Sequence, residues 1–313
     1  MNNTSYEALI VGGGPAGLAA AMAMGRMGRR VLLCDDRQPR NAPSEHINNF
    51  PGHDGVHPEV WRKRVRQELQ KYPTVQLQTC RVAHIQKHGQ EFLIKLETEL
   101  ESKAQIQVKK VLLAYGVRDT MRPIENYREL WGKSVFHCPY CHGFSLMNEP
   151  LGLLGNGDTG YHMLNMLWGL SQDLVLFTEG PSTLSKEQQK ALQNNQIQVI
   201  ETPIKALQKT EQGLDVVLEN GDILQRRALY AQPVLPFQKS ATLGEELGCE
   251  VDEMGFYGVN DQGLTSVPGV FAAGDIAGMT RHSVPLSMAS GTQAAAVMVS
   301  ELLSEAFQGS VPV

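Results

Sequence analysis

The sequence predicts an α/β protein with two Rossmann-like domains of the kind that binds FAD or NAD(P). A glycine-rich turn of the form Gly-x-Gly-x-x-Gly follows an apolar segment near residue 12, and the same arrangement returns near residue 155. Each copy has the order strand, turn, helix, strand that is typical of dinucleotide-binding units. The length of 313 residues exceeds one average domain, which also favours two.

The first unit begins with an apolar strand at residues 8–11 that leads into Gly12, Gly14 and Gly17. Gly12 permits a tight turn, Gly14 lets the backbone approach a pyrophosphate, and Gly17 lets the helix pack closely on the strand. A second strand, residues 31–34, ends at Asp35, where a carboxylate can bind ribose hydroxyls. This stretch therefore predicts a dinucleotide site.

The segment that follows, residues 75–116, reads as strands and turns, with alternating polarity in QEFLIKLETEL. We expect a small antiparallel layer that covers the first domain. The second unit has a strand at residues 151–154, a glycine turn, an amphipathic helix and a strand at residues 174–177. Near the end of the chain, we expect a helix that opens at Ser283 as N-cap, with Pro285 in its first turn.

Composition argues against several classes of protein. The chain has 28 basic and 33 acidic residues and no run of Lys or Arg, so nucleic acid is not expected as a partner. The N-terminus shows no secretion signal, and no apolar run approaches the roughly 18 residues of a membrane span. We therefore expect a cytoplasmic protein without a membrane segment.

Cys138 and Cys141 flank Pro139 and Tyr140, and His142 follows, so the stretch spells C-x-x-C-H. It could be a redox-active dithiol, a c-type haem attachment site or half of a zinc site. Haem attachment usually takes place outside a reducing compartment, and no second Cys or His pair follows at a spacing that suits zinc. The dithiol is favoured, and no metal is expected.

Taken together, these motifs resemble those of the low-molecular-weight thioredoxin reductases over essentially the whole chain. The matching segments occur in family order: GGGPAG, NNFPG, AYGVRD, the C-x-x-C, the second glycine turn and GVFAAGDIAG. The resemblance implies a discontinuous FAD-binding domain, residues 1–117 and 246–313. It also implies a pyridine-nucleotide-type domain, residues 118–245, that carries the C-x-x-C, and a homodimer overall.

The resemblance also implies roles for individual residues. Cys141 would face the flavin, while Cys138 would exchange with the substrate. The FAD-binding residues would be Gly12, Gly14, Pro15, Ala16, Gly17, Asp35, Asn49, Gly116, Gly274, Asp275, Ser283 and Val284.

The second glycine turn departs from the NADPH-linked members, which carry a basic H-R-R cluster after the second strand of this domain. Here the same place reads Phe177, Thr178, Glu179, Gly180. A 2′-phosphate would be repelled by Glu179 and would lack a bidentate partner, so NADPH is disfavoured. Two interpretations stay open. The domain either binds a second adenine dinucleotide, FAD or NADH, through Gly155, Gly157, Gly160 and Glu179, or is a relic with an exposed acid.

Three further positions differ from the common family pattern. His142 replaces an Asp, and an imidazole with a pKa near neutrality can exchange protons with an incoming dithiol. Tyr115 replaces a Thr, and Ser283-Val284-Pro285 replaces Q-A-x. These features resemble the gliotoxin-type dithiol oxidases and the diflavin-linked disulfide oxidoreductases, relatives that dispense with NADPH. His282 could contact flavin or substrate, or cap a turn.

The sequence thus predicts an FAD-dependent thiol-disulfide oxidoreductase in which Cys138, Cys141 and His142 are catalytic and which works mainly as a dithiol oxidase. Its partner would be a small dithiol or disulfide, or a thioredoxin-like protein. The alternative is a thioredoxin reductase that takes electrons from NADH or a ferredoxin-like donor. A third hypothesis, from another class, is a non-catalytic flavoprotein that signals its redox state.

Overall fold

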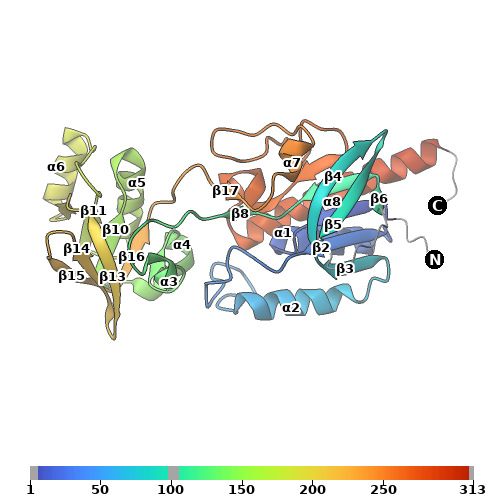
Figure 1. Ribbon diagram of the computed structural model, residues 1–313. Helices are drawn as coiled ribbons and strands as arrows, with labels where there is room; N and C mark the ends of the chain where they lie inside the picture. The colour runs from blue at the N-terminus through green and yellow to red at the C-terminus, as the bar shows by residue number, and fades with distance from the viewer. Residues whose placement is uncertain (1–5, 98–105, 310–313) are drawn as a thin grey trace. The chain divides into compact units, whose positions relative to one another are not determined.

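The computed structural model describes residues 6–97 and 106–309, and the chain divides into two compact units (Figure 1). Part of the alternating segment expected before residue 106 lies outside these residues. The first unit comprises Met1–Ala42, Glu59–Arg118 and Pro236–Val313, and the second Pro43–Pro58 and Asp119–Leu235. The segment with Asn49 thus makes its contacts in the second unit.

The first unit is built on a parallel sheet with the strand order β18-β7-β1-β2-β3. Every residue of the central β1 is buried, which explains its purely apolar sequence. Helices α1 and α8 pack against each other. The elements are β1 (Ala8–Val11), α1 (Pro15–Arg26), β2 (Val31–Asp35), α2 (Pro58–Leu69), β3 (Val75–Thr79), β7 (Lys110–Leu113), β18 (Val270–Ala272) and α8 (Val284–Gln308).

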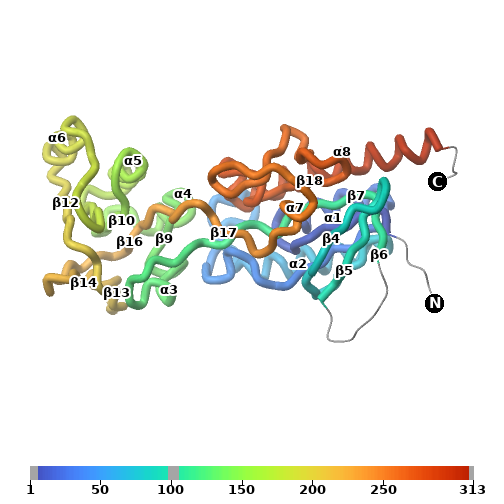
Figure 2. Tube along the Cα trace, turned by 45° about the horizontal axis from the view of Figure 1, so that its top comes forward, coloured from blue at the N-terminus to red at the C-terminus, as the bar shows by residue number. Residues whose placement is uncertain are grey.

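An antiparallel layer covers one face of this sheet, as the alternating segment predicts. It consists of β4 (Arg81–His88), β5 (Glu91–Glu97) and β6 (Ile106–Val108), which lie together in Figure 2. Phe92 and Ile94 of this layer share a buried core with Leu9 and Val11 of β1. The remaining elements of the unit are β8 (Val117–Arg118), β17 (Gln238–Lys239), α7 (Leu243–Glu246) and the 3₁₀ turns η2 (Gly274–Ala277) and η3 (Met279–Arg281).

The second unit has its own parallel sheet, with the order β12-β11-β10-β16-β9. Its two predicted strands occur at the expected residues, β10 (Leu151–Leu154) and β11 (Leu174–Phe177). An antiparallel sheet of β13, β14 and β15 packs on it. The other elements are α3 (Tyr127–Leu130), β9 (Val135–Phe136), α4 (Pro139–His142), η1 (Phe144–Leu146), α5 (Gly157–Trp168), α6 (Lys186–Asn194), β12 (Gln198–Ile200), β13 (Ile204–Thr210), β14 (Gly213–Leu218), β15 (Ile223–Arg226) and β16 (Ala228–Ala231).

Across residues 6–97 and 106–309, no helix combines the length and the apolar character that crossing a membrane would require.

Candidate active site

Cys138 and Cys141 are joined by a disulfide in the second unit, with their Cα atoms 5.3 Å apart. Cys138 is the N-cap of the one-turn helix α4, and Pro139 occupies its first turn, where a fixed φ suits a helix start. The short helix places the two sulfur atoms on one side of a single turn. Both cysteines are partly exposed, so a substrate can reach the pair.

His142 ends this helix and stacks on Phe136 of β9, with ring centroids 4.0 Å apart. Burial, helped by the neighbouring His46, lowers the pKa of His142 to about 4. The expectation of a pKa near neutrality is therefore wrong for this arrangement, because one face of the ring packs against an aromatic side chain and is removed from water. Its Nδ1 is buried without a hydrogen-bond partner among the described residues. The imidazole is neutral at pH 7.

The disulfide borders a cavity of about 450 Å³ in the second unit. Tyr140 and Phe144 line it with 75% and 89% of their surface exposed, so two large apolar side chains flank the cysteines in water. Together they form an apolar patch beside the disulfide that a ligand can cover. The complete lining is Asn48, Asn49, Phe50, Pro51, Asp54, Tyr140, Cys141, His142, Phe144 and Ser145, without a Lys or Arg.

The segment before the cavity is tied to the disulfide by Asn48, whose Nδ2 donates to the backbone oxygen of Cys141 at 2.6 Å. Sequence reasoning identified the neighbouring Asn49, which has a left-handed backbone (φ 57°), and missed Asn48. Cys141 and His142 thus share a cavity with Asn49, whereas Cys138 is absent from its lining. The other residues expected to bind FAD belong to the first unit.

The glycine turn of the first unit is shaped to receive a phosphate. Gly12 has φ 106°, and a Cβ there would lie 2.5 Å from the backbone oxygen of Ala114. A Cβ on Gly14 would meet nothing within 4 Å, and no side chain caps α1, whose first turn is free of acidic residues. An open, uncapped N-terminus of a 12-residue helix is a good site for an anion. Pro15 and Ala16 form its first turn.

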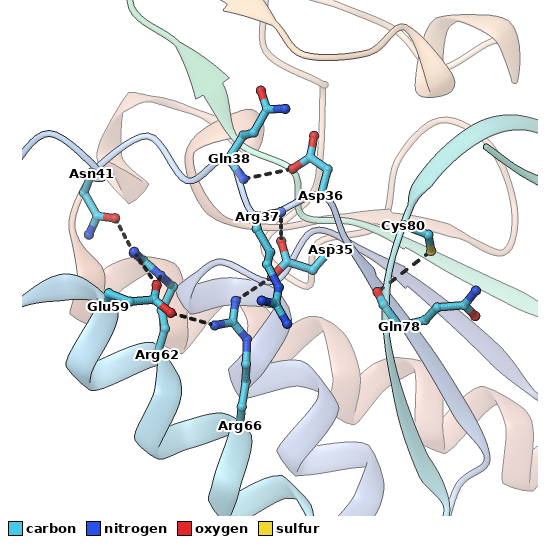
Figure 3. A network of polar contacts seen from close by, with 10 residues as sticks. All are labelled: Asp35, Asp36, Arg37, Gln38, Asn41, Glu59, Arg62, Arg66, Gln78 and Cys80. Atoms are coloured by element: carbon cyan, nitrogen blue, oxygen red, sulfur yellow. Dashed lines mark hydrogen bonds and ion pairs between the residues drawn. The ribbon is translucent and has the colours of Figure 1, made fainter. Parts of the chain in front are cut away.

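Asp35 ends β2 beside this turn and is held by a polar network (Figure 3). Its Oδ2 accepts from Arg66 Nη2 of α2 at 2.6 Å, and its Oδ1 accepts from the backbone N–H of Arg37 at 3.0 Å. A Cβ on Gly13 would lie 2.3 Å from the Asp35 carboxylate, so only glycine fits there. Sequence reasoning missed both Gly13 and Arg66.

The C-terminal part of the first unit agrees with the predicted helix start. Ser283 is the N-cap of α8, and its side chain accepts from the backbone N–H of Leu286. Val284 is the first residue of the helix, and Asp275 lies in η2 directly after Gly274. Asp275 Oδ1 accepts from Ser287 Oγ at 3.2 Å. Gly116 follows Tyr115, whose hydroxyl contacts that of Tyr257 at 2.6 Å.

The glycine turn of the second unit is occupied by the chain itself. Asn156 caps α5, and its Oδ1 accepts from Gly157 N, Thr183 N and Thr183 Oγ1 at 2.9, 2.9 and 3.1 Å. Its Nδ2 donates to the backbone oxygens of Thr178 and Pro181. Asp158 adds a carboxylate to the first turn. Asn156, whose side chain closes this turn, lies between Gly155 and Gly157 in the sequence.

Glu179 also has a structural partner. Its Oε1 accepts from the backbone N–H of Ile204 at 2.7 Å, and its φ of 56° places it in the left-handed region. The carboxylate thus fastens the turn after β11 to the start of β13. Gly160 packs on Gly155, with a Cβ position 3.0 Å from the Gly155 carbon. His137 stacks on Trp131 with centroids 5.6 Å apart, a structural role.

Comparison with known proteins agrees with this geometry. The model for the pyridine nucleotide-disulphide oxidoreductase family matches residues 6–297. The chain belongs to this family. It is 31% identical to "Thioredoxin reductase aclD" of Aspergillus oryzae over an alignment 313 residues long. The alignment covers 95% of this chain and 96% of the relative.

Solved structures give the same result for this oxidoreductase. The crystal structure of HlmI superposes with a TM-score of 0.90 at 31% identity, over 99% of this chain and 96% of the other. The oxidoreductase from Agrobacterium tumefaciens gives a TM-score of 0.87 at 30% identity, over 96% and 99%. The chain is therefore a flavoprotein oxidoreductase of the low-molecular-weight thioredoxin reductase type, and the family implies FAD as its cofactor.

Proposed function

We propose that this oxidoreductase oxidises small, uncharged dithiols at the Cys138–Cys141 disulfide and does not depend on NADPH. The FAD-binding residues of the first unit are those around the open glycine turn and the start of α8. The protein acts as a cytoplasmic homodimer.

The observation that carries the independence from NADPH is the contrast between the two glycine turns. At α1 the helix N-terminus is uncapped and faces open space. At α5 the Asn156 side chain already accepts from the backbone N–H groups of Gly157 and Thr183. A pyrophosphate would have to displace these hydrogen bonds, each of which contributes about 1 kcal/mol. The second turn is therefore a poor dinucleotide site.

Glu179 supports the same conclusion. To bind a ribose, the Glu179 carboxylate would have to accept hydrogen bonds from the ribose hydroxyls. It already accepts one from the backbone N–H of Ile204. A 2′-phosphate would need a cation, and the loop of residues 178–185 contains no Lys or Arg. Of the two interpretations left open by the sequence, we favour the relic domain. NADH and a second FAD are then not cofactors of this unit.

The exposed aromatic side chains beside the disulfide support the choice of substrate. Tyr140 and Phe144 offer aromatic faces to an apolar molecule, and the lining has no basic side chain to attract an anion. A compact dithiol with an apolar body can cover these two side chains while it reaches the disulfide.

The chemistry at the disulfide follows thiol–disulfide exchange. One substrate thiolate attacks Cys138, forms a mixed disulfide and releases Cys141 as a thiolate. The second thiol of the substrate then attacks the substrate sulfur of the mixed disulfide. The substrate leaves as a disulfide, and Cys138 is released as a thiolate. Two electrons remain on the cysteine pair. FAD would supply a two-electron acceptor for them, with an oxidant such as molecular oxygen as the final acceptor.

His142 is the proton-handling residue of this proposal. While the disulfide is closed, its imidazole is neutral and its buried Nδ1 has a free lone pair, or a proton without a partner. When the disulfide opens, the negative charge on Cys141 raises the pKa of the adjacent imidazole. A proton from the substrate thiol is then held at His142 only while the thiolate exists. When the disulfide closes again, the pKa of His142 returns to its low value, and the imidazole releases the proton.

An anaerobic titration of the flavin absorbance tests the proposal. A dithiol should bleach the purified holoenzyme, air should restore the band, and NADPH and NADH should leave it unchanged. Cys138→Ser and Cys141→Ser should each abolish bleaching by the dithiol. Turnover in either variant would refute the mechanism, and bleaching by a pyridine nucleotide would restore the alternative, a reductase that delivers electrons to a thioredoxin.

A further inference from the structure

Arg40, Asp275 and His282 form a closed cluster in the first unit, although Arg40 and Asp275 are 235 positions apart in sequence. Arg40 Nη1 donates to Asp275 Oδ2 at 2.9 Å and contacts His282 Nδ1 at 3.1 Å. His282 Nε2 lies 3.1 Å from the backbone oxygen of Asp275. Only 14% of the Arg40 side chain and 21% of the Asp275 side chain are exposed, so water weakens these contacts little.

These contacts determine the tautomer of His282. A guanidinium group has only donors, so Nδ1 must accept from Arg40. A carbonyl oxygen has only acceptor sites, so Nε2 must carry the proton and donate to Asp275. The ring is therefore neutral, with its proton on Nε2. Phe237 and Phe256 contact it edge-on, with centroids 5.2 and 5.4 Å away, and fix the plane of the ring.

The same surroundings orient the Asp275 carboxylate from both ends. Arg40 lies over the Phe237 ring, 5.2 Å from its centroid, while it holds Oδ2. Ser287 is buried, and its Oγ lies 3.2 Å from Oδ1 and 2.9 Å from the backbone oxygen of Arg281, so its single proton is shared between these two acceptors. Each carboxylate oxygen can accept more than one hydrogen bond, so acceptor capacity remains for hydroxyl donors from a ligand.

We propose that Arg40 and His282 are positioning residues that hold the Asp275 carboxylate ready for the ribityl hydroxyls of FAD. The inference rests on the proposed FAD site, in which the family resemblance implies that Asp275 contacts the ribityl chain. Arg40 sets the direction of the carboxylate and neutralises its charge next to an anionic cofactor. His282 links Arg40 to the backbone of Asp275, so that guanidinium, imidazole and η2 move as one body.

FAD affinity tests this proposal without any assay of turnover. The FAD-free protein is titrated with FAD, and the change in flavin fluorescence gives Kd. Arg40→Met should raise Kd about tenfold, a change of about 1.4 kcal/mol, because FAD would then have to bind a carboxylate that is neither oriented nor compensated in charge beforehand. Arg40→Lys should give a Kd between those of the unchanged protein and Arg40→Met, because an ammonium group keeps the charge but lacks the planar fork of a guanidinium group. His282→Gln should also weaken FAD binding.

A spectroscopic measurement separates positioning from a general structural effect. The ¹⁵N signals of labelled histidine should show His282 as the Nε2–H tautomer, with assignment from their loss in His282→Gln. In Arg40→Met the backbone oxygen of Asp275 still accepts from Nε2, so the tautomer should be kept, but the Nδ1 signal should shift because Nδ1 loses its hydrogen-bond donor. Arg64 is exposed on α2, so Arg64→Met is the control for net charge and should change neither Kd nor the Nδ1 signal.

Equal Kd values for Arg40→Met and Arg64→Met would overturn the proposal, as would an unchanged His282 Nδ1 signal in Arg40→Met. If Arg40→Met does not fold, judged by its circular dichroism, Arg40→Lys and His282→Gln decide the question by the same two measurements. The Cys138→Ser result on dithiol bleaching is independent of these outcomes. A failure of the dithiol mechanism can therefore be distinguished from a failure of this inference.

Discussion

The imidazole of His142 lies on the phenyl ring of Phe136, with the two planes tilted by only 19°. The ring is buried by this stack and its pKa is lowered to about 4, so the residue beside the redox disulfide is neutral across the physiological range. The same contact couples the protonation of His142 to folding.

We expect the free energy of unfolding to fall as the pH drops from about 6.5 to about 4. In this window the unfolded chain protonates His142 and the folded chain does not, so the stability present above the unfolded pKa is lost on acidification. Urea unfolding at pH 7.5 and pH 5 measures the effect. His142→Asn should reduce the difference between the two pH values, whereas the exposed His162→Asn should not. Equal differences in both variants would contradict the buried neutral state.

Phe144 should determine the affinity for the dithiol. Its side chain is 89% exposed and lines the cavity next to Cys141. Phe144→Ala removes an apolar surface whose burial under a substrate contributes about 1.5–3 kcal/mol. We expect KM for an apolar dithiol to rise about tenfold or more with little change in kcat.

Phe307→Ala is the matched control, because this side chain is 88% exposed on α8. Steady-state kinetics of both variants with one dithiol decide the point. A weaker Kd for FAD in Phe144→Ala at unchanged KM would show that the side chain contacts the flavin and not the substrate.

Local spacing made much of the fold predictable, because a glycine turn constrains the residues directly before and after it. Strands β10 and β11 and the N-cap Ser283 therefore occur where the sequence places them. The ion pairs that orient the two carboxylates expected to bind FAD could not be predicted from local spacing. Asp35 meets Arg66 across 31 positions and Asp275 meets Arg40 across 235, and such contacts depend on how the elements pack.

Asn156 shows a second kind of limit. The pattern Gly155-x-Gly157-x-x-Gly160 is intact, so spacing alone predicts a dinucleotide site. The residue between the first two glycines has an amide that can satisfy the helix N-terminus from within. The sequence does show an Asn, a common N-cap residue, inside the turn. Its effect on the site follows only from its contacts with Thr178, Pro181 and Thr183, which the structure shows.

Asn156→Ala should therefore destabilise the second unit without affecting catalysis. Loss of an N-cap costs about 0.5–2 kcal/mol, and the amide also fastens the loop after β11, so we expect the upper part of that range. Calorimetry measures the shift in Tm. Ser185→Ala removes the capping box of α6 and should cost about 1 kcal/mol, which gives a reference for an ordinary cap. Dithiol bleaching should stay unchanged, and unchanged stability would contradict the structural role of Asn156.

The ion pair between Arg66 and Asp35 leads to a prediction about the adenosine end of FAD. Arg66 Nη2 holds Asp35 Oδ2 at 2.6 Å, and Arg66 Nη1 also contacts Glu59 Oε1 at 3.3 Å. The side chains of Arg66 and Asp35 are 20% and 15% exposed, so the pair is shielded from water. If Asp35 binds the ribose hydroxyls, Arg66 holds its carboxylate in a single orientation.

Arg66→Met should then raise Kd for FAD about tenfold, as expected for the loss of one charge-assisted contact. Arg66→Lys should have a smaller effect, because an ammonium keeps the charge but lacks the fork that reaches Asp35 and Glu59 together. Lys63 is exposed on the same helix, so Lys63→Met should leave Kd unchanged. FAD titration of the three variants compares them directly. Tighter binding in Arg66→Met would mean that Arg66 competes with the ribose for Asp35, because removing the cation would then free the carboxylate for the cofactor.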